Sequence, residues 1–250
     1  MNEMHLYDNL IAESLELAEN TGFRELPAGG HALWETEAEQ RLIFQKDMAY
    51  ELGGGGLPAV SALAFTSLPA KTDRLLLCGP DLPRLKADSP YARLTILHVD
   101  GGDWQDDQQA YRLLRQMEYT RYHVYPRGFM MRISTSAGRE PVRVSREALK
   151  NGLDFTQAGR LFLEAYHRHP QVRAVTLLFV TAPDFPYGLL AEKAVRMEAV
   201  TNSLDQIWNN LAMDCRSCRL KPVCDEVEGL RELHFSREKG KAPTQAHQGL

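Results

Sequence analysis

The sequence has no long apolar run and no strong net charge, and it has only four cysteines. No apolar run approaches the ~20 residues that a helix needs to cross a bilayer. With a net charge of −4, no overall electrostatic field favours nucleic acid or an acidic membrane surface. Residues 1–20 carry acids and no early basic cluster before an apolar core, so we expect no secretory signal. We therefore expect neither a membrane nor a nucleic-acid partner.

Familiar catalytic patterns are also missing. No Ser/His/Asp or paired-carboxylate arrangement stands out, so nothing indicates a hydrolase. The glycine run 53–56 is not followed by Lys-Ser/Thr, as a phosphate-binding loop would be. It predicts a turn or a close approach of two backbone segments instead.

Cysteine is scarce but clustered. Three of the four cysteines fall within residues 215–224, in the pattern Cys215-x2-Cys218-x5-Cys224. Such clustering argues against a disulfide framework and indicates a reducing, cytoplasmic compartment. Two thiolates separated by two residues can bind one metal centre, and a third thiolate nearby can act as a further ligand. His234, ten positions after Cys224, is the candidate fourth ligand. The pattern predicts an iron–sulfur or zinc site; the alternative is a reduced loop without metal.

Hydrophobic periodicity predicts an α/β or α+β fold, with a mixed β-sheet flanked by helices and a cysteine loop after a long helix. We expect strands at 47–52, 74–78, 93–99, 129–134, 142–144 and 172–180, and a strand or a short buried helix at 60–66. We expect helices over the first twenty residues and at 106–117, 146–151, 156–167, 227–234 and from Pro186 to about Ala212. Gly22 is expected to end the first helix, and Ser145 to cap the helix at 146–151.

These elements divide the chain into four parts. An N-terminal helical segment covers residues 1–25, and an α/β domain covers 26–212. The cysteine loop covers 213–235, and the polar, aperiodic tail 236–250 is expected to be disordered. No internal repeat is present.

Three stretches carry a resemblance to a known family. They are residues 47–54 (DMAYELGG), 79–82 (GPDL) and 142–152 (VRVSREALKNG), followed in order by the apolar run 172–180 and the cysteine loop. In their order and separation they resemble the middle region of acetyl-CoA synthase, the β subunit of the carbon monoxide dehydrogenase/acetyl-CoA synthase complex. The likeness runs from about residue 26 to residue 234.

The resemblance implies that Cys215, Cys218 and Cys224 hold a 4Fe–4S cluster, which in that family is one part of a nickel-containing centre. The sequence departs from the family in its shorter second gap and in lacking the fourth cysteine. Spacing places that fourth position at His234, whereas a local Gly-Leu pair places it at Arg231. These 250 residues contain no Cys-Gly-Cys to bind nickel, and we expect no counterpart of the domain that receives carbon monoxide within them.

The resemblance therefore implies a role in anaerobic one-carbon or corrinoid metabolism, alongside a protein partner. We expect the isolated chain to be inactive as a complete synthase, because carbon–carbon coupling needs a metal with open positions. The alternative is a non-catalytic module that is stapled by zinc and binds a partner protein or a coenzyme A-like ligand.

Arginine is concentrated in the middle of the chain. Between Arg112 and Arg173, eleven arginines and one lysine stand against five acids. Arginine binds phosphate in a bidentate manner, and the resemblance implies a coenzyme A site in this region. Four arginines surround the predicted hairpin and are the candidate coenzyme A ligands: Arg127, Arg132, Arg139 and Arg143. The family's tryptophan at this site is replaced, near Met131 or Arg132. The alternative is an ordinary solvated basic face.

Overall fold

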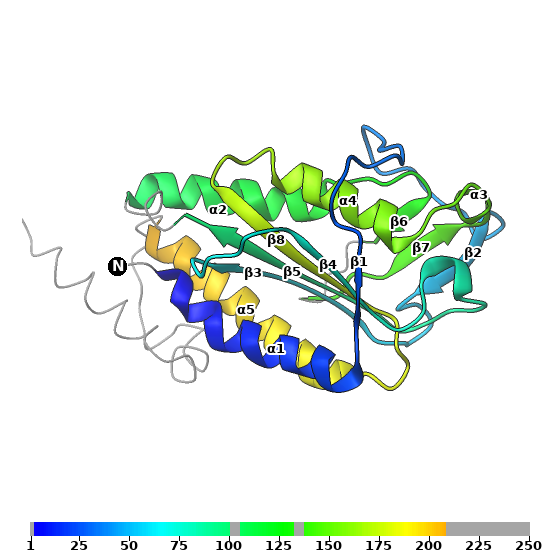
Figure 1. Ribbon diagram of the computed structural model, residues 1–250, viewed down its shortest axis with the longest axis horizontal. Helices are drawn as coiled ribbons and strands as arrows, with labels where there is room; N and C mark the ends of the chain where they lie inside the picture. Colours follow the sequence, from blue (N-terminus) through cyan, green and yellow to red (C-terminus); the bar gives the residue numbers. More distant parts are fainter. Residues whose placement is uncertain (1–2, 101–105, 133–137, 209–250) are drawn as a thin grey trace, which may run out of the picture.

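The strands of this protein form two sheets, seen in a computed structural model that describes residues 3–100, 106–132 and 138–208. The larger sheet has five strands, in the order β1-β4-β8-β5-β3 (Figure 1). Its strands are β1 (Arg24–Leu26), β3 (Ala59–Thr66), β4 (Arg74–Cys78), β5 (Tyr91–Val99) and β8 (Val172–Val180). All eight residues of β3 are buried, and so are eight of the nine in β5 and in β8. Burial on both faces explains why these strands read as continuous apolar runs.

The five-stranded sheet is mixed. β8 and β5 pair antiparallel at its centre, with Leu94 opposite Leu178. On either side the pairing is parallel: β4 with β8 and β3 with β5. The short strand β1 closes one edge by pairing antiparallel with β4. The two halves of the sheet, β1–β4 and β5–β3, are thus joined only through β8.

The smaller sheet has three antiparallel strands in the order β2-β7-β6. They are β2 (Met48–Leu52), β6 (Phe129–Met131) and β7 (Val142–Ser145). A bridge between Leu52 and Ser89 connects β2 to the segment just before β5. The Gly53 N–H also donates to the Ser89 carbonyl at 2.7 Å. These contacts place the end of β2 beside the start of β5.

Helices cover both faces of the large sheet (Figure 1). On one face lie α5 (Tyr187–Trp208), which packs on β3, and α1 (Asp8–Thr21), which packs on α5. On the other lie α4 (Phe155–Tyr166), against β4 and β8, and α2 (Asp107–Tyr122), which contacts both α4 and α5. A short helix, α3 (Arg146–Lys150), follows β7, and two 3₁₀ helices span Glu3–Tyr7 and Leu82–Arg84.

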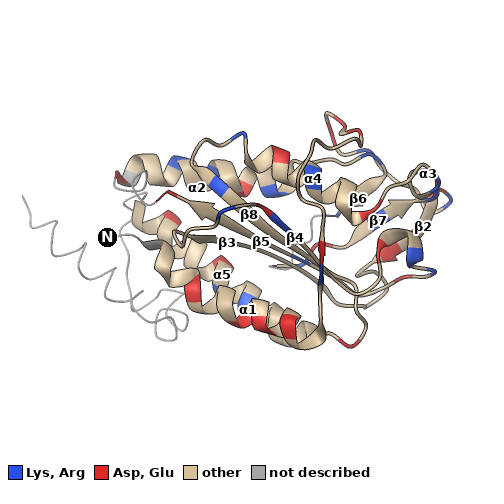
Figure 2. Cartoon of the chain, viewed as in Figure 1, with Lys and Arg blue, Asp and Glu red and all other residues tan. Residues whose placement is uncertain are grey.

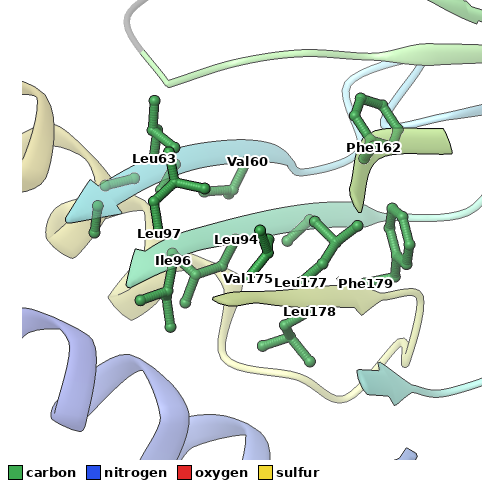
Figure 3. Close-up of a cluster of buried hydrophobic side chains, with 14 of the residues drawn as sticks. Val60, Leu63, Leu94, Ile96, Leu97, Phe162, Val175, Leu177, Leu178 and Phe179 are labelled. Atoms are coloured by element: carbon green, nitrogen blue, oxygen red, sulfur yellow. The ribbon is translucent and has the colours of Figure 1, made fainter. Parts of the chain in front are cut away.

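One apolar core lies between these layers. Val60, Leu94, Phe162, Leu177 and Phe179 are among the buried side chains that come together from β3, β5, β8 and α4 (Figure 3). Residues of the 3₁₀ helix Glu3–Tyr7 and of α1 belong to the same core. The Tyr7 hydroxyl hydrogen-bonds the Thr201 hydroxyl of α5 at 2.9 Å. Each large apolar side chain that is fully buried stabilises the folded state by about 1.5–3 kcal/mol.

Two glycines allow close approaches between chain segments. Gly79 has φ +104°, and a Cβ there would lie 2.4 Å from the Ala182 backbone nitrogen. Gly53 has φ +68°, and its Cβ would lie 2.3 Å from the Ala59 Cβ. Neither position can take a larger residue without a shift of the backbone. The glycine run therefore serves a tight turn from β2 toward β3.

The mixed α/β class predicted from the sequence is confirmed. The segment at 60–66 is a strand rather than a short helix. The sequence prediction missed β1, and α2 continues to Tyr122 instead of ending at residue 117. α5 is described as far as Trp208, so its predicted end near Ala212 and the elements beyond it lie outside the described residues. In the part of the chain that is described, no helix has the length and apolar character to cross a membrane.

Candidate functional site

The predicted metal ligands Cys215, Cys218, Cys224 and His234 lie outside the described residues. In the sequence, Trp208 at the end of the described part of α5 stands seven positions before Cys215. The remaining thiol, Cys78, is buried at the end of β4, and burial raises its pKa to about 11, with Asp184 adding to the shift. A buried thiol with a raised pKa is a poor nucleophile and metal ligand. Residues 3–100, 106–132 and 138–208 contain no group of three His, Cys, Asp or Glu side chains that could hold a metal.

Three of the four predicted coenzyme A arginines meet at the end of the small sheet, around Glu51. Arg132, just after β6, donates to the Glu51 carboxylate through Nη1. Arg143 of β7 faces Glu51 in the strand register, with its Nε 3.6 Å from Oε1. Arg139 donates from Nη2 to the Gly53 carbonyl at 3.3 Å. We call Arg132, Arg139 and Arg143 the surface arginine cluster; it lies beside the glycine turn.

The charge of the surface arginine cluster is only partly neutralised. Asp88 Oδ1 accepts the backbone N–H of Glu51 at 2.7 Å, so two carboxylates stand near three guanidinium groups. The Arg132 side chain is 46% exposed, whereas that of Glu51 is 11% exposed. Positive and negative residues are accordingly interleaved around β2, β6 and β7 (Figure 2). An anion that reaches this face would meet guanidinium groups that are already oriented by Glu51.

Arg127 lies apart from the surface arginine cluster, at the opposite end of β6. Its Nη1 donates to Glu35 Oε2 at 2.6 Å, and Nη2 lies 4.0 Å from the Glu147 carboxylate. The hydrogen bond that Arg127 donates to Glu35 raises the pKa of the Arg127 guanidinium above its ordinary value. The four arginines predicted as one site are therefore divided by the hairpin into a group of three and a single residue.

A second group of charged residues is buried, and the sequence interpretation did not single it out. Arg93 of β5 and Glu140 form an ion pair with Nη2 2.9 Å from the carboxylate, and both side chains are buried. Arg93 Nη2 also donates to the Arg121 carbonyl at 3.1 Å, and its guanidinium lies 4.3 Å from the centre of the Phe162 ring. Arg121 of α2 donates to the Ser61 carbonyl at 2.7 Å. We call Arg93, Arg121 and Glu140 the buried arginine cluster.

Within the described part of the chain, several polar atoms in and beside the buried arginine cluster lack a hydrogen-bond partner. Among the described atoms, nothing hydrogen-bonds Arg93 Nε, Arg93 Nη1 or the Tyr91 hydroxyl. Burial lowers the pKa of Arg93, but attraction to Glu140, Tyr91 and Tyr166 outweighs it, so the net shift is upward. Arg93 therefore stays charged inside the core. An arginine within the apolar run 91–99 is the signal in the sequence that could have identified this cluster.

A pocket of about 640 Å³ lies between the segment 33–44, the turn before β6 and α3. Leu33, Leu42 and Phe44 line it and are 84%, 67% and 60% exposed. The Trp34 indole donates to the Arg127 carbonyl at 2.8 Å at the same pocket. Of the four predicted arginines, which are all described, only Arg127 lines this pocket.

Comparison with known proteins gave no match, neither to a family model nor to a curated protein. The function of the chain must therefore be argued from three features: the cysteine segment that follows α5, the surface arginine cluster and the pocket along residues 33–44.

Proposed function

We propose that this chain is an iron–sulfur protein related to the acetyl-CoA synthase β subunit, acting with a protein partner in anaerobic one-carbon metabolism in the cytoplasm. The observation that carries the proposal is the Cys215-x2-Cys218-x5-Cys224 pattern placed soon after α5. Three thiolates at this spacing fit a cluster or a zinc ion, and the three similar stretches at 47–54, 79–82 and 142–152 favour the cluster.

Cys215, Cys218 and Cys224 would hold the cluster, with His234 as the candidate fourth ligand. A 4Fe–4S cluster supplies an electron-transfer centre, or an open iron position where a thiolate is missing. The 250 residues contain no Cys-Gly-Cys, so these residues alone are proposed not to form the nickel site or to complete acetyl-CoA synthesis. The CO-methylating activity would belong to an assembly rather than to this chain.

Coenzyme A would bind at the surface arginine cluster. Its 3′-phosphate and diphosphate need several cations, and the guanidinium groups of Arg132, Arg139 and Arg143 lie near one turn. Glu51 competes with the ligand for Arg132 and Arg143, because it already pairs with both. Arg127 forms an ion pair with Glu35 and takes no part in the proposed coenzyme A site.

The metal is tested by anaerobic purification followed by iron, sulfide and zinc analysis. A 4Fe–4S cluster makes the protein brown, absorbing near ~400 nm, whereas zinc has no such absorption. Cys218→Ser should remove the cluster, and Cys78→Ala, which deletes the buried thiol of β4, should retain it. Full iron content in Cys218→Ser would refute the proposal.

The role of His234 needs a separate variant. Exchanging imidazole for a non-ligand changes both charge and donor strength at the iron. His234→Ala should therefore lower cluster retention or shift the reduction potential. An unchanged iron content, potential and spectrum would exclude His234 as a ligand.

A second candidate function is a zinc-stapled module that binds a partner protein or a coenzyme A-like ligand. The exposed apolar side chains at the pocket favour it, because such patches mark interaction surfaces. One zinc per chain, no sulfide and no absorption near ~400 nm would select this candidate over the first.

A further inference from the structure

Residues 33–44 expose an unusual amount of apolar surface. The described part of the chain has seven large hydrophobic residues that are highly exposed, and three of them are Leu33, Leu42 and Phe44. All three line the same pocket. Single exposed apolar residues are ordinary, but a group around one hollow indicates an interaction surface.

This segment is held firmly against the small sheet, so its exposure does not come from fraying. The Glu37 N–H donates to the Tyr125 carbonyl at 2.9 Å, and the Arg127 N–H donates to the Glu35 carbonyl at 3.0 Å. Arg143 Nη1 donates to the Ile43 carbonyl at 3.0 Å. Ile43 itself is buried, while its two neighbours are exposed. Leu42 and Phe44 therefore flank a residue that is anchored in the protein, and both present their side chains to solvent.

The pocket is also acidic. Its lining includes four carboxylates and two guanidinium groups: Glu35, Glu37, Asp47 and Glu147 against Arg41 and Arg127. Both arginines are occupied, Arg127 by Glu35 at 2.6 Å and Arg41 by Glu37 at 3.6 Å. Within the described residues, no basic side chain forms an ion pair with Asp47. The charge that remains for a ligand is therefore negative.

We propose that this face docks a partner polypeptide through an extended segment that presents apolar side chains next to lysine or arginine. The apolar side chains cover Leu33, Leu42 and Phe44, and the cations meet Asp47 and the acids at the rim. Complementary charge of this kind speeds association and excludes wrong partners. The observations behind this docking face do not include the cysteine segment or its proposed metal site.

Two other occupants fit the surface less well. A second copy of the chain, related by a two-fold axis, would place the same excess of carboxylates against itself. A drug-sized ligand usually has 70–90% of its surface buried, but this pocket is bordered by side chains that are 60–84% exposed. An extended polypeptide tolerates such an open site, because its ends continue beyond it.

The probe is a pair of short fluorescent peptides, one alternating leucine with lysine and the other alternating leucine with glutamate. Fluorescence anisotropy with the full chain should show saturable binding of the lysine peptide, weakened by salt, and no binding of the glutamate peptide. Leu42→Ser with Phe44→Ser should weaken binding about tenfold, and Asp47→Asn severalfold. These side chains are exposed or border the pocket, so the fold should survive the changes.

Matched controls distinguish peptide binding at the docking face from nonspecific binding to other exposed apolar or acidic residues. Leu68→Ser removes an equally exposed apolar residue elsewhere, and Glu16→Gln removes an exposed acid of α1. Both should leave the affinity unchanged. Equal weakening by the controls, equal binding of the glutamate peptide, or a dimer in analytical ultracentrifugation that Phe44→Ser dissociates would overturn the proposal.

Discussion

The buried and the surface arginine clusters use the same side chain in opposite surroundings. Arg93 pairs with Glu140 inside the core, where both side chains have at most 1% exposure. Arg132 pairs with Glu51 at the surface and keeps nearly half of its own area in contact with solvent. In the core, water cannot replace a lost partner, so the stability of the fold depends on keeping both members of the pair. At the surface, water can replace it, so the guanidinium groups remain available to a ligand.

The largest effect is expected from Glu140→Ala, which leaves the charge of Arg93 buried without its carboxylate. Breaking a buried pair in this way costs about 3–5 kcal/mol. Urea denaturation should show a correspondingly lower free energy of unfolding. The double variant Arg93→Met with Glu140→Leu should recover most of that loss, since it removes both charges. A loss below 1 kcal/mol in Glu140→Ala would show that water reaches Arg93.

Glu51→Gln makes the corresponding change in the surface arginine cluster. It should cost only about 1 kcal/mol, because the half-exposed Arg132 can turn to solvent. It should also raise the affinity for coenzyme A severalfold, because the carboxylate that competes for both arginines is gone. Calorimetric titration at low and high salt measures this. An unchanged or lower affinity would mean that Glu51 does not compete with the ligand.

The smallest change in stability is expected from Arg132→Gln, within about 0.5 kcal/mol, because an exposed side chain is replaced. Its affinity for coenzyme A should nevertheless fall severalfold. Arg127→Gln is the matched control at the other end of β6, and it should leave that affinity unchanged. Equal losses in the two variants would indicate a diffuse basic face rather than a site at the glycine turn.

Much of the fold could be predicted because its signals are local. Gly22 ends α1 with φ +90°, as a glycine after a helix often does. The Ser145 side chain caps α3 by accepting the Ala148 N–H at 3.4 Å. The apolar run 172–180 matches β8 in both bounds. By contrast, β1 has only three residues, too few for its pattern to stand out.

The site was harder to predict, because its geometry depends on residues far apart in sequence. Arg132 and Glu51 are 81 positions apart, and nothing in either local sequence indicates that they pair. Arg127 and Arg132 are close in sequence but lie at opposite ends of β6, since a strand separates residues that a helix would bring together. Arg93 illustrates the same difficulty, because its partner Glu140 is 47 positions away.

The position of β8 has a consequence for synthesis of the chain. Asp73, next to β4, accepts the Val175 N–H at 2.9 Å, a contact that spans 102 positions. Until β8 leaves the ribosome, the nascent sheet consists of two separate pairs, β1 with β4 and β3 with β5, and two-stranded sheets are marginally stable in water. At 5–20 residues per second, that wait lasts about 5–20 s. During it, the edges of β4 and β5 that later pair with β8 lack their common partner, and unpaired strand edges of this kind are prone to aggregate.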